Sequence, residues 1–265
     1  MSTRGAPALR SLASPDLVIA RCILFPCAGC GPGSYSGLKN AVPPEWAFDA
    51  FCSPGRENRF GEPFASSVED LASEAVHWVR ELSTDADVPL VLVGHSLGAL
   101  VAWLVAAQVP TDTLVVAAAA PPDIGGPRFN SDSSESVEEY LARLLEARGV
   151  LDIELREELV MLCAPILAAD VELLDRFSPV DRELSCDVLA IYGQQDTVDA
   201  LAWSGQTSAR ATSITLPGSH FFIWEDPAAF INALRTHVGC LANLRVVAPL
   251  SATRPDLGSS EDDAL

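Results

Sequence analysis

The sequence is poor in positive charge and has no long apolar run. Its 265 residues include 17 Lys and Arg against 36 Asp and Glu, which gives a formal net charge of −19. Such a charge disfavours nucleic acids and anionic membranes as partners. No apolar run reaches the roughly 18 residues needed to cross a bilayer. We therefore expect a protein that binds neither nucleic acid nor membrane, with one sizeable core at this length.

The beginning of the chain lacks the apolar segment of a secretory signal peptide. This favours a cytoplasmic location. We interpret residues 1–16 as a disordered lead-in and residues 17–240 as one domain. Residues 241–265 show little periodicity and end in a run rich in Ser and Asp. We expect them to form a disordered or loosely docked tail.

Cysteine is present in an odd number, seven, which is typical of reduced thiols rather than a disulfide framework. Cys27 and Cys30 form a C-x-x-C pair that could be a redox motif. Gly29 and Gly31 place this pair in a loop, however, and not at the helix N-terminus that would lower a thiol pKa. No second Cys/His pair has metal-ligand spacing. We expect no metal and no redox cofactor.

Short apolar runs alternate with helical patterns along most of the chain. This alternation predicts an α/β fold, with a mostly parallel sheet and helices on both faces. Ser67 and Asp70 resemble a capping box at the start of the first long helix. The expected strands are residues 17–25, 47–52, 89–93, 113–120, 187–192 and 212–216, and the expected helices of the main layer are residues 67–82, 99–107 and 227–238.

Residues 123–182 interrupt this alternation with three helical patterns, at residues 137–148, 153–163 and 165–177. An insertion between strands at the carboxyl edge of the sheet would lie over a site there. We interpret it as a helical lid that shapes an acyl pocket and excludes water. Ordinary helices on the face of the sheet are the alternative.

The pattern Gly94-x-Ser96-x-Gly98 lies between an apolar strand and an apolar helix. A serine in a tight strand-to-helix turn projects its hydroxyl at the carboxyl edge of the sheet, and small flanking residues let helix and strand approach. We interpret this turn as the nucleophile elbow of an α/β-hydrolase fold. A Gly-rich turn with an inert serine is the alternative.

A serine nucleophile needs an adjacent base. His220 follows an expected strand and precedes the last helix, where a general base would lie. His95 lies inside the elbow and should point away from the Ser96 hydroxyl. His77 and His237 fall on expected helices, where a surface or core role is more common.

The acid that orients the base should lie between serine and histidine in the chain. Asp196 and Asp123 both follow expected strands, and we favour Asp196. The oxyanion hole needs two backbone N–H groups. One is expected from Leu97, the residue after the nucleophile, and the other from the loop at residues 27–29.

Several motifs together resemble the type II thioesterases that accompany polyketide synthases and nonribosomal peptide synthetases. Besides the elbow, the resemblance rests on residues 25–29, 53–56, 59–63, 165–170, 193–196 and 218–222. Cys27, Cys30, Ser53 and Ser219 depart from the usual pattern. We expect these differences to bear on acyl preference more than on reaction type.

The resemblance implies Ser96, Asp196 and His220 as a catalytic triad, with the Ala28 and Leu97 amides as the oxyanion hole. It implies hydrolysis of acyl thioesters held on the phosphopantetheine of acyl or peptidyl carrier proteins, which clears aberrant acyl groups. The alternatives are a small-molecule carboxylesterase, an acyltransferase or cyclase with the same triad, or a binding protein that kept the elbow. We expect a monomer that docks carriers through a local basic or apolar patch near the lid.

Overall fold

The structure is a computed structural model that describes residues 8–124, 136–147, 150–178, 182–196 and 200–247. These residues form a seven-stranded sheet in the order β1-β3-β2-β4-β5-β6-β7. All neighbouring strands are parallel except β1, which is antiparallel to β3. The strands are β1 (Leu9–Ala13), β2 (Ala20–Phe25), β3 (Trp46–Phe51), β4 (Leu90–His95), β5 (Thr113–Ala117), β6 (Asp187–Gly193) and β7 (Ala211–Leu216).

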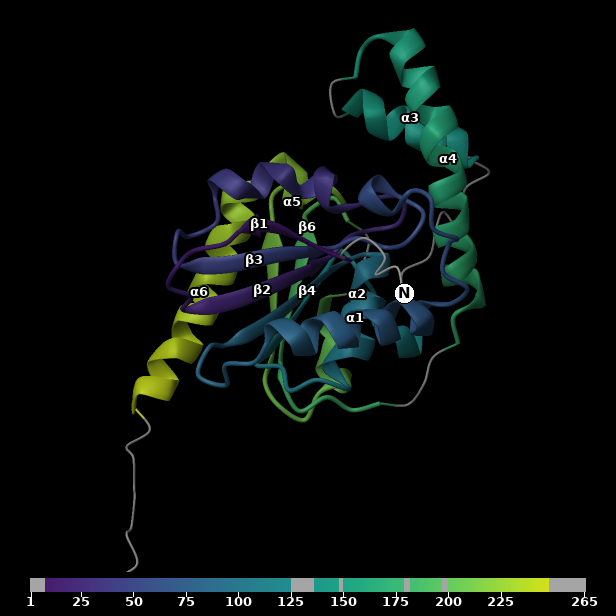
Figure 1. The fold of residues 1–265 in the computed structure, drawn as a ribbon. Coiled ribbons are helices and arrows are strands. Elements are labelled where there is room, and N and C mark those ends of the chain that lie inside the picture. The colour runs from purple at the N-terminus through teal and green to yellow at the C-terminus, as the bar shows by residue number, and fades with distance from the viewer. Residues whose placement is uncertain (1–7, 125–135, 148–149, 179–181, 197–199, 248–265) are drawn as a thin grey trace, which may run out of the picture.

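Helices cover both faces of the sheet (Figure 1). One apolar cluster joins the sheet to α1 (Val68–Leu82) and α2 (Leu97–Ala106). A second cluster joins the opposite face to α5 (Phe222–Glu225) and α6 (Pro227–Val247). Along β4, Leu92 belongs to the first cluster and Val91 and Val93 to the second, because successive side chains of a strand point to opposite faces. The predicted α/β fold with a mostly parallel sheet is therefore confirmed.

The beginning of the chain differs from our prediction. Residues 9–13, which we expected in a disordered lead-in, form the edge strand β1. Leu9 pairs with Phe51 of β3, and Leu12 is buried against the sheet. A five-residue antiparallel edge strand has too short a pattern to stand out from a loop in the sequence. Residues 1–7 lie outside the described residues.

The predicted lid contains two helices in the described residues, α3 (Val137–Ala147) and α4 (Ile153–Arg176). They lie beside each other and extend away from the sheet (Figure 1). We predicted a break before Pro165, but α4 continues through it for 24 residues. Proline removes one helical hydrogen bond, which a long packed helix tolerates. Residues 125–135, 148–149 and 179–181 of the predicted insertion lie outside the described residues.

The last helix is longer than predicted, since α6 continues to Val247. Its final residues overlap the tail that we expected from residue 241. Leu241, Ala242 and Leu244 are good helix formers, so the helix continues although the apolar periodicity has stopped. Residues 248–265 of the expected tail lie outside the described residues.

Candidate active site

Ser96 occupies a strained turn between β4 and α2. Its φ is 52° and its ψ is −118°, a conformation that non-glycine residues rarely adopt. The Ser96 N–H donates to the Ala117 carbonyl at 2.9 Å, which anchors the turn to the end of β5. A Cβ at Gly94 would collide with the Ala99 backbone, and one at Gly98 would collide with the Phe25 backbone. The glycines of the motif therefore allow the close approach of helix and strand that the turn needs.

His220 and Asp196 lie together at the same edge of the sheet. Asp196 follows β6, and His220 lies between β7 and α5. His220 Nδ1 is 3.2 Å from Asp196 Oδ2, with the two side chains 34% and 6% exposed. Asp123 lies exposed on a short 3-10 helix, Pro122–Ile124. Of the two acids considered from the sequence, the structure brings Asp196 to the histidine.

The loop that carries His220 is held from two sides. The Ser219 N–H and hydroxyl donate to the Glu225 carboxylate at 2.9 and 2.5 Å. Gly218 has a φ of +118°, which favours glycine. A Cβ at Gly193 would collide with the Ser219 carbonyl, so the end of β6 packs directly against this loop. These contacts hold the backbone of the loop that carries the His220 side chain.

His95 is fully buried beside the site, and its two nitrogens are both engaged. Nε2 lies 2.9 Å from the His220 carbonyl, and Nδ1 lies 2.7 Å from the Tyr35 hydroxyl. A carbonyl only accepts, so Nε2 carries the proton and Nδ1 accepts from Tyr35. Burial, followed by the neighbouring His220, lowers the pKa of His95 to about 3. His95 is thus a neutral bridge from the elbow to the His220 loop.

Tyr35 extends this bridge to the loop after β2, because its hydroxyl accepts from the Cys27 N–H at 3.1 Å. Sequence reasoning missed Tyr35. It lies in the 3-10 helix η1 (Pro32–Asn40), a segment for which the sequence pattern predicts no helix. A buried tyrosine needs a partner for its hydroxyl, but the sequence does not show which one.

The two amides considered for the oxyanion hole come from the loop after β2 and the start of α2. Leu97 is the first residue of α2, where the partial positive charge of a helix N-terminus lies. Ala28 lies between Cys27, held by Tyr35, and Gly29, whose N–H donates to Asp170 Oδ2 at 2.8 Å. The loop that carries Ala28 is therefore anchored on both sides of it.

Arg56 and Asp170 form a buried ion pair next to this loop. Arg56 Nη1 and Nη2 contact the two Asp170 carboxylate oxygens at 2.6 and 2.7 Å. Burial opposes the charge of Arg56, the hydrogen bonds to Asp170 favour it, and the guanidinium pKa is raised above its usual value. The sequence singled out both motifs separately but gave no sign that they meet.

Cys27 and Cys30 are both buried in the apolar cluster of this loop. Burial, followed by the adjacent Cys30, raises the pKa of the Cys27 thiol well above its usual value. A thiol with a raised pKa carries little thiolate at neutral pH and reacts slowly. This environment does not favour a redox role for the C-x-x-C pair.

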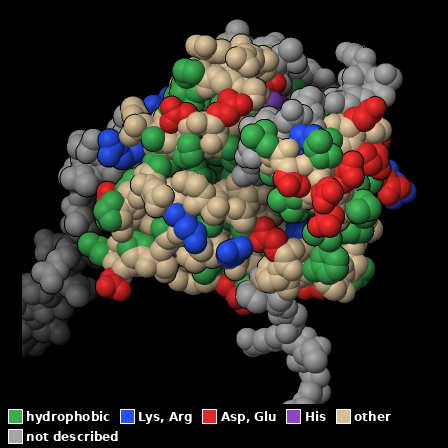
Figure 2. All heavy atoms as spheres, turned by 90° about the horizontal axis from the view of Figure 1, so that it is seen from above, with side chains coloured by type: hydrophobic (Ala, Val, Ile, Leu, Met, Phe, Trp, Pro, Cys, Tyr) green, Lys and Arg blue, Asp and Glu red, His purple; other side chains and the backbone are tan. Residues whose placement is uncertain are grey.

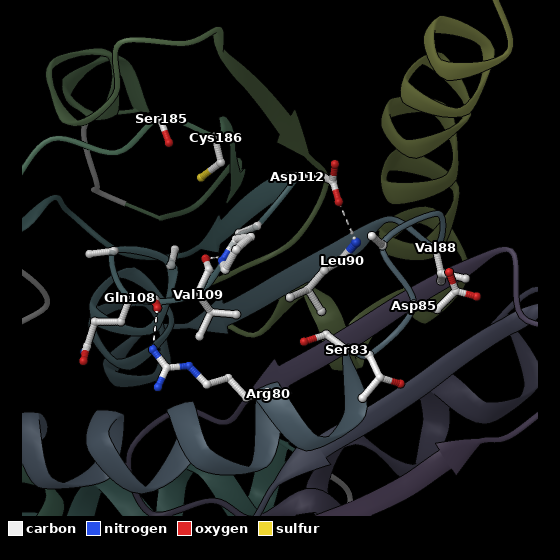
Figure 3. A pocket seen from close by; sticks show the side chains of 16 residues that line it. Arg80, Ser83, Asp85, Val88, Leu90, Gln108, Val109, Asp112, Ser185 and Cys186 are labelled. Carbon is white, nitrogen blue, oxygen red and sulfur yellow. Dashed lines mark hydrogen bonds between the residues drawn. The ribbon is translucent and has the colours of Figure 1, made fainter. Parts of the chain in front are cut away.

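A cavity of about 680 Å³ lies at the opposite edge of the sheet (Figure 3). It is lined by the end of α1, the start of β4 and the segments before β5 and β6, including Ser83 and Asp112. The Asp112 carboxylate accepts from the Leu90 N–H at 2.8 Å, so it serves the local backbone. This cavity is separate from Ser96 and His220, which lie at the carboxyl ends of the strands.

Two features are absent from the part of the chain that the structure describes. No group of three or more His, Cys, Asp or Glu side chains there could hold a metal ion. None of the helices described is both long enough and apolar enough to cross a membrane.

Comparison with known proteins relates this chain to thioesterases. A family model described as thioesterase domain matches residues 20–237. The human S-acyl fatty acid synthase thioesterase, medium chain, is 30% identical over 187 residues, which cover 66% of this chain and 69% of that protein.

Solved structures agree with the sequence match. BorB, described as the type II thioesterase from the borrelidin biosynthetic cluster, is 25% identical with a TM-score of 0.73 and covers 89% of this chain and 99% of its own. RedJ, a thioesterase from the prodiginine pathway of Streptomyces coelicolor, is 26% identical with a TM-score of 0.71, covering 90% and 96%.

Proposed function

Because this chain belongs to the thioesterase domain family, we propose that it is a serine thioesterase that edits carrier-bound acyl groups in polyketide or nonribosomal peptide synthesis. The observation that carries the site assignment is the contact of His220 with Asp196 at the sheet edge where Ser96 forms the elbow. We assign Ser96 as nucleophile, His220 as general base and Asp196 as the acid that orients it.

In the acylation step, the Ser96 hydroxyl attacks the thioester carbonyl while His220 takes its proton. The Asp196 carboxylate stabilises the imidazolium and holds the ring in the orientation that presents Nε2 to the serine. The tetrahedral intermediate collapses, the C–S bond breaks, and His220 gives its proton to the departing pantetheine thiolate. An ester of the acyl group with Ser96 remains.

In the deacylation step, water attacks this ester while His220 accepts one of its protons. Collapse of the second intermediate returns the proton to Ser96 and releases the free acid. In both steps the carbonyl oxygen becomes an oxyanion, and we assign its stabilisation to the Ala28 and Leu97 amides.

The exposed surface of α4 favours a carrier protein as the source of the substrate. Several large apolar side chains on α4 and just before it are exposed, a feature that marks interaction surfaces in soluble proteins. These residues are Leu151, Ile153, Leu155, Met161 and Leu162. Viewed from above, hydrophobic and acidic side chains lie side by side on the right of the molecule, the side on which Figure 1 places α3 and α4 (Figure 2). This apolar group fits the patch that we expected for carrier docking.

The test is deacylation of short acyl-phosphopantetheinyl carrier proteins, followed by intact-protein mass spectrometry. The wild-type protein should release the acyl group faster from carriers than from matched free thioesters or oxygen esters. Ser96→Ala should abolish this release. Turnover of simple esters with no release from any carrier would instead indicate a carboxylesterase, and transfer of the acyl group to a hydroxyl would indicate an acyltransferase or cyclase.

A further inference from the structure

The buried Arg56–Asp170 pair does not belong to the triad, yet it contacts the loop of Ala28 directly. Arg56 comes from the turn after β3, and Asp170 comes from the lid helix α4. They are 4% and 2% exposed. Desolvating two charges costs several kcal/mol, and apolar residues of similar volume often stabilise a core as well or better. Stability is therefore a weak reason for this pair to be present.

The contacts of the pair converge on two adjacent residues of the loop. Asp170 Oδ2 accepts from the Gly29 N–H at 2.8 Å and from Arg56 Nη1 at 2.6 Å. The same Arg56 nitrogen donates to the Cys30 carbonyl at 3.1 Å. The Gly29–Cys30 segment is therefore held by an acceptor at its N–H and a donor at its carbonyl.

Gly29 also adopts a left-handed backbone conformation, which the Arg56–Asp170 pair helps to hold. Its φ is +75°, and a Cβ there would lie 3.2 Å from Leu167. Leu167 and Asp170 are three residues apart on α4, so one face of the lid helix contacts this loop. The bidentate fork between a guanidinium and a carboxylate restricts orientation more than a single contact does.

We propose that Arg56 and Asp170 are positioning residues that set the Ala28 amide for the oxyanion, by holding Gly29 and Cys30 against the lid helix. The proposal rests on the proposed oxyanion role of Ala28. An oxyanion donor must lie close to where the charge develops, and a misplacement of about 1 Å can cost on the order of 100-fold in rate. Asp170 also makes the position of this donor depend on α4 being docked.

The test compares Asp170→Asn and Arg56→Lys with a control variant in the segment after β3 that also carries Arg56. Glu62→Gln removes a carboxylate from Arg59, a second buried arginine, which it contacts at 3.0 Å through Nε. On an acyl-pantetheine thioester, Asp170→Asn should lower kcat by about 10- to 100-fold with KM changed less than about twofold. Arg56→Lys keeps one charge–charge contact and should lower kcat less. Glu62→Gln should lower the melting temperature but leave kcat unchanged.

A second readout separates positioning from stability. An alkyl boronic acid forms a tetrahedral adduct with a serine nucleophile, so its oxygen occupies the place of the oxyanion. In Asp170→Asn, the affinity for the boronic acid should fall by about the same factor as kcat/KM. Both constants are expressed per active site, and titration of a separate sample with a fluorophosphonate gives the concentration of active sites. A structural role would lower the titrated fraction and leave both per-site constants unchanged, which would overturn the proposal.

The outcomes also separate this proposal from the assignment of the site. If Ser96→Ala still hydrolyses thioesters, the proposed active site is wrong. If Ser96→Ala is inactive while Asp170→Asn keeps its kcat per site, only the positioning role is wrong. If neither Asp170→Asn nor Arg56→Lys folds, hydrogen exchange of the Gly29 amide in the wild-type protein tests whether the loop is anchored. Protection supports the anchored loop, and exchange as fast as in an open loop contradicts it.

Discussion

At the residue scale, the surroundings of each histidine decide its chemistry. His95 is completely buried and neutral, with a pKa lowered to about 3. The His220 side chain is 34% exposed and contacts Asp196. The two rings lie 5.5 Å apart, yet only His220 meets both an acid and solvent. One side chain type therefore provides a structural bridge at position 95 and a candidate base at position 220.

The choice between the two acids can be tested by paired variants. Asp196→Asn should lower kcat for thioester hydrolysis roughly a thousandfold, because the amide neither fixes the His220 tautomer nor stabilises the imidazolium. Asp123→Asn, an exposed change on the 3-10 helix, should leave kcat within about twofold. Steady-state kinetics on an acyl-pantetheine thioester measures both. A larger loss for Asp123→Asn would reverse the assignment.

The buried neutral state of His95 predicts a specific pH dependence of stability. The unfolded chain binds a proton at position 95 below pH 6.5, whereas the folded protein does so only near pH 3. The stability due to neutral His95 is therefore present above pH 6.5 and is lost as the pH falls. From pH 7 to pH 5, the wild-type free energy of unfolding should fall by about 2 kcal/mol more than that of His95→Gln.

Gln is the matched replacement because its amide can donate to the His220 carbonyl and accept from Tyr35. Urea unfolding at the two pH values gives both free energies. Other titrating groups are common to the two proteins and cancel in the difference. Equal losses in the two proteins would show that His95 is not held neutral by its burial.

At the scale of elements, the two halves of α4 differ: the first half is exposed, and the second half packs against the site. Met161 and Leu162 near its middle are exposed, while Ile166, Leu167 and Asp170 are buried. One continuous helix thus connects the apolar surface considered for carrier docking to the loop of Ala28. Two separate helices, as the sequence pattern predicted, would not couple these regions so directly.

The continuity of α4 predicts the effect of replacing Pro165, which is exposed inside the helix. Pro165→Ala restores a helical N–H and removes a ring clash, so it should stabilise α4 by up to about 3 kcal/mol. Hydrogen exchange of the α4 amides measures this change. Ala168→Gly, at an exposed position one turn later, should lower protection by about 1 kcal/mol. Unchanged protection in Pro165→Ala would indicate that a helix starts at the proline.

At the scale of the whole molecule, the net charge of −19 would oppose the approach of a carrier protein that is itself acidic. Apolar docking on α4 would act only at short range, after this repulsion has been overcome. Salt screens charges over about 10 Å at 0.1 M, and it leaves apolar contacts in place. The rate of encounter should therefore depend on ionic strength even though the docking contact does not.

This difference predicts that kcat/KM depends on salt for a carrier-bound substrate and not for a free thioester. Raising the salt from about 0.02 M to about 0.2 M should increase kcat/KM for an acyl carrier protein several-fold. The value for the matched free pantetheine thioester should stay constant, because that substrate lacks the carrier's charge. A fall of kcat/KM with salt, for the carrier alone, would point to a local basic patch as the docking site.

Residues close together in the chain are enough to predict several features of this protein. The alternation of apolar runs and helical patterns predicted the parallel sheet, and small residues around Ser96 predicted the strained turn. Ser67 was expected to cap α1, and its hydroxyl accepts from the Asp70 N–H at 3.0 Å. The place of His220 after the last strand followed from the order of elements. These features follow from residues close together in the chain or from the order in which such segments occur.

Contacts between residues far apart in the chain are seen only in the folded protein. Arg56 and Asp170 are 114 positions apart, and Tyr35 and His95 are 60 apart. Likewise, Asp123 and Asp196 both follow strands, and only the packed sheet shows which one reaches His220. The edge strand β1 also depends on its partner β3. Such pairings leave no local pattern, because the geometry that makes them favourable exists only once the chain has folded.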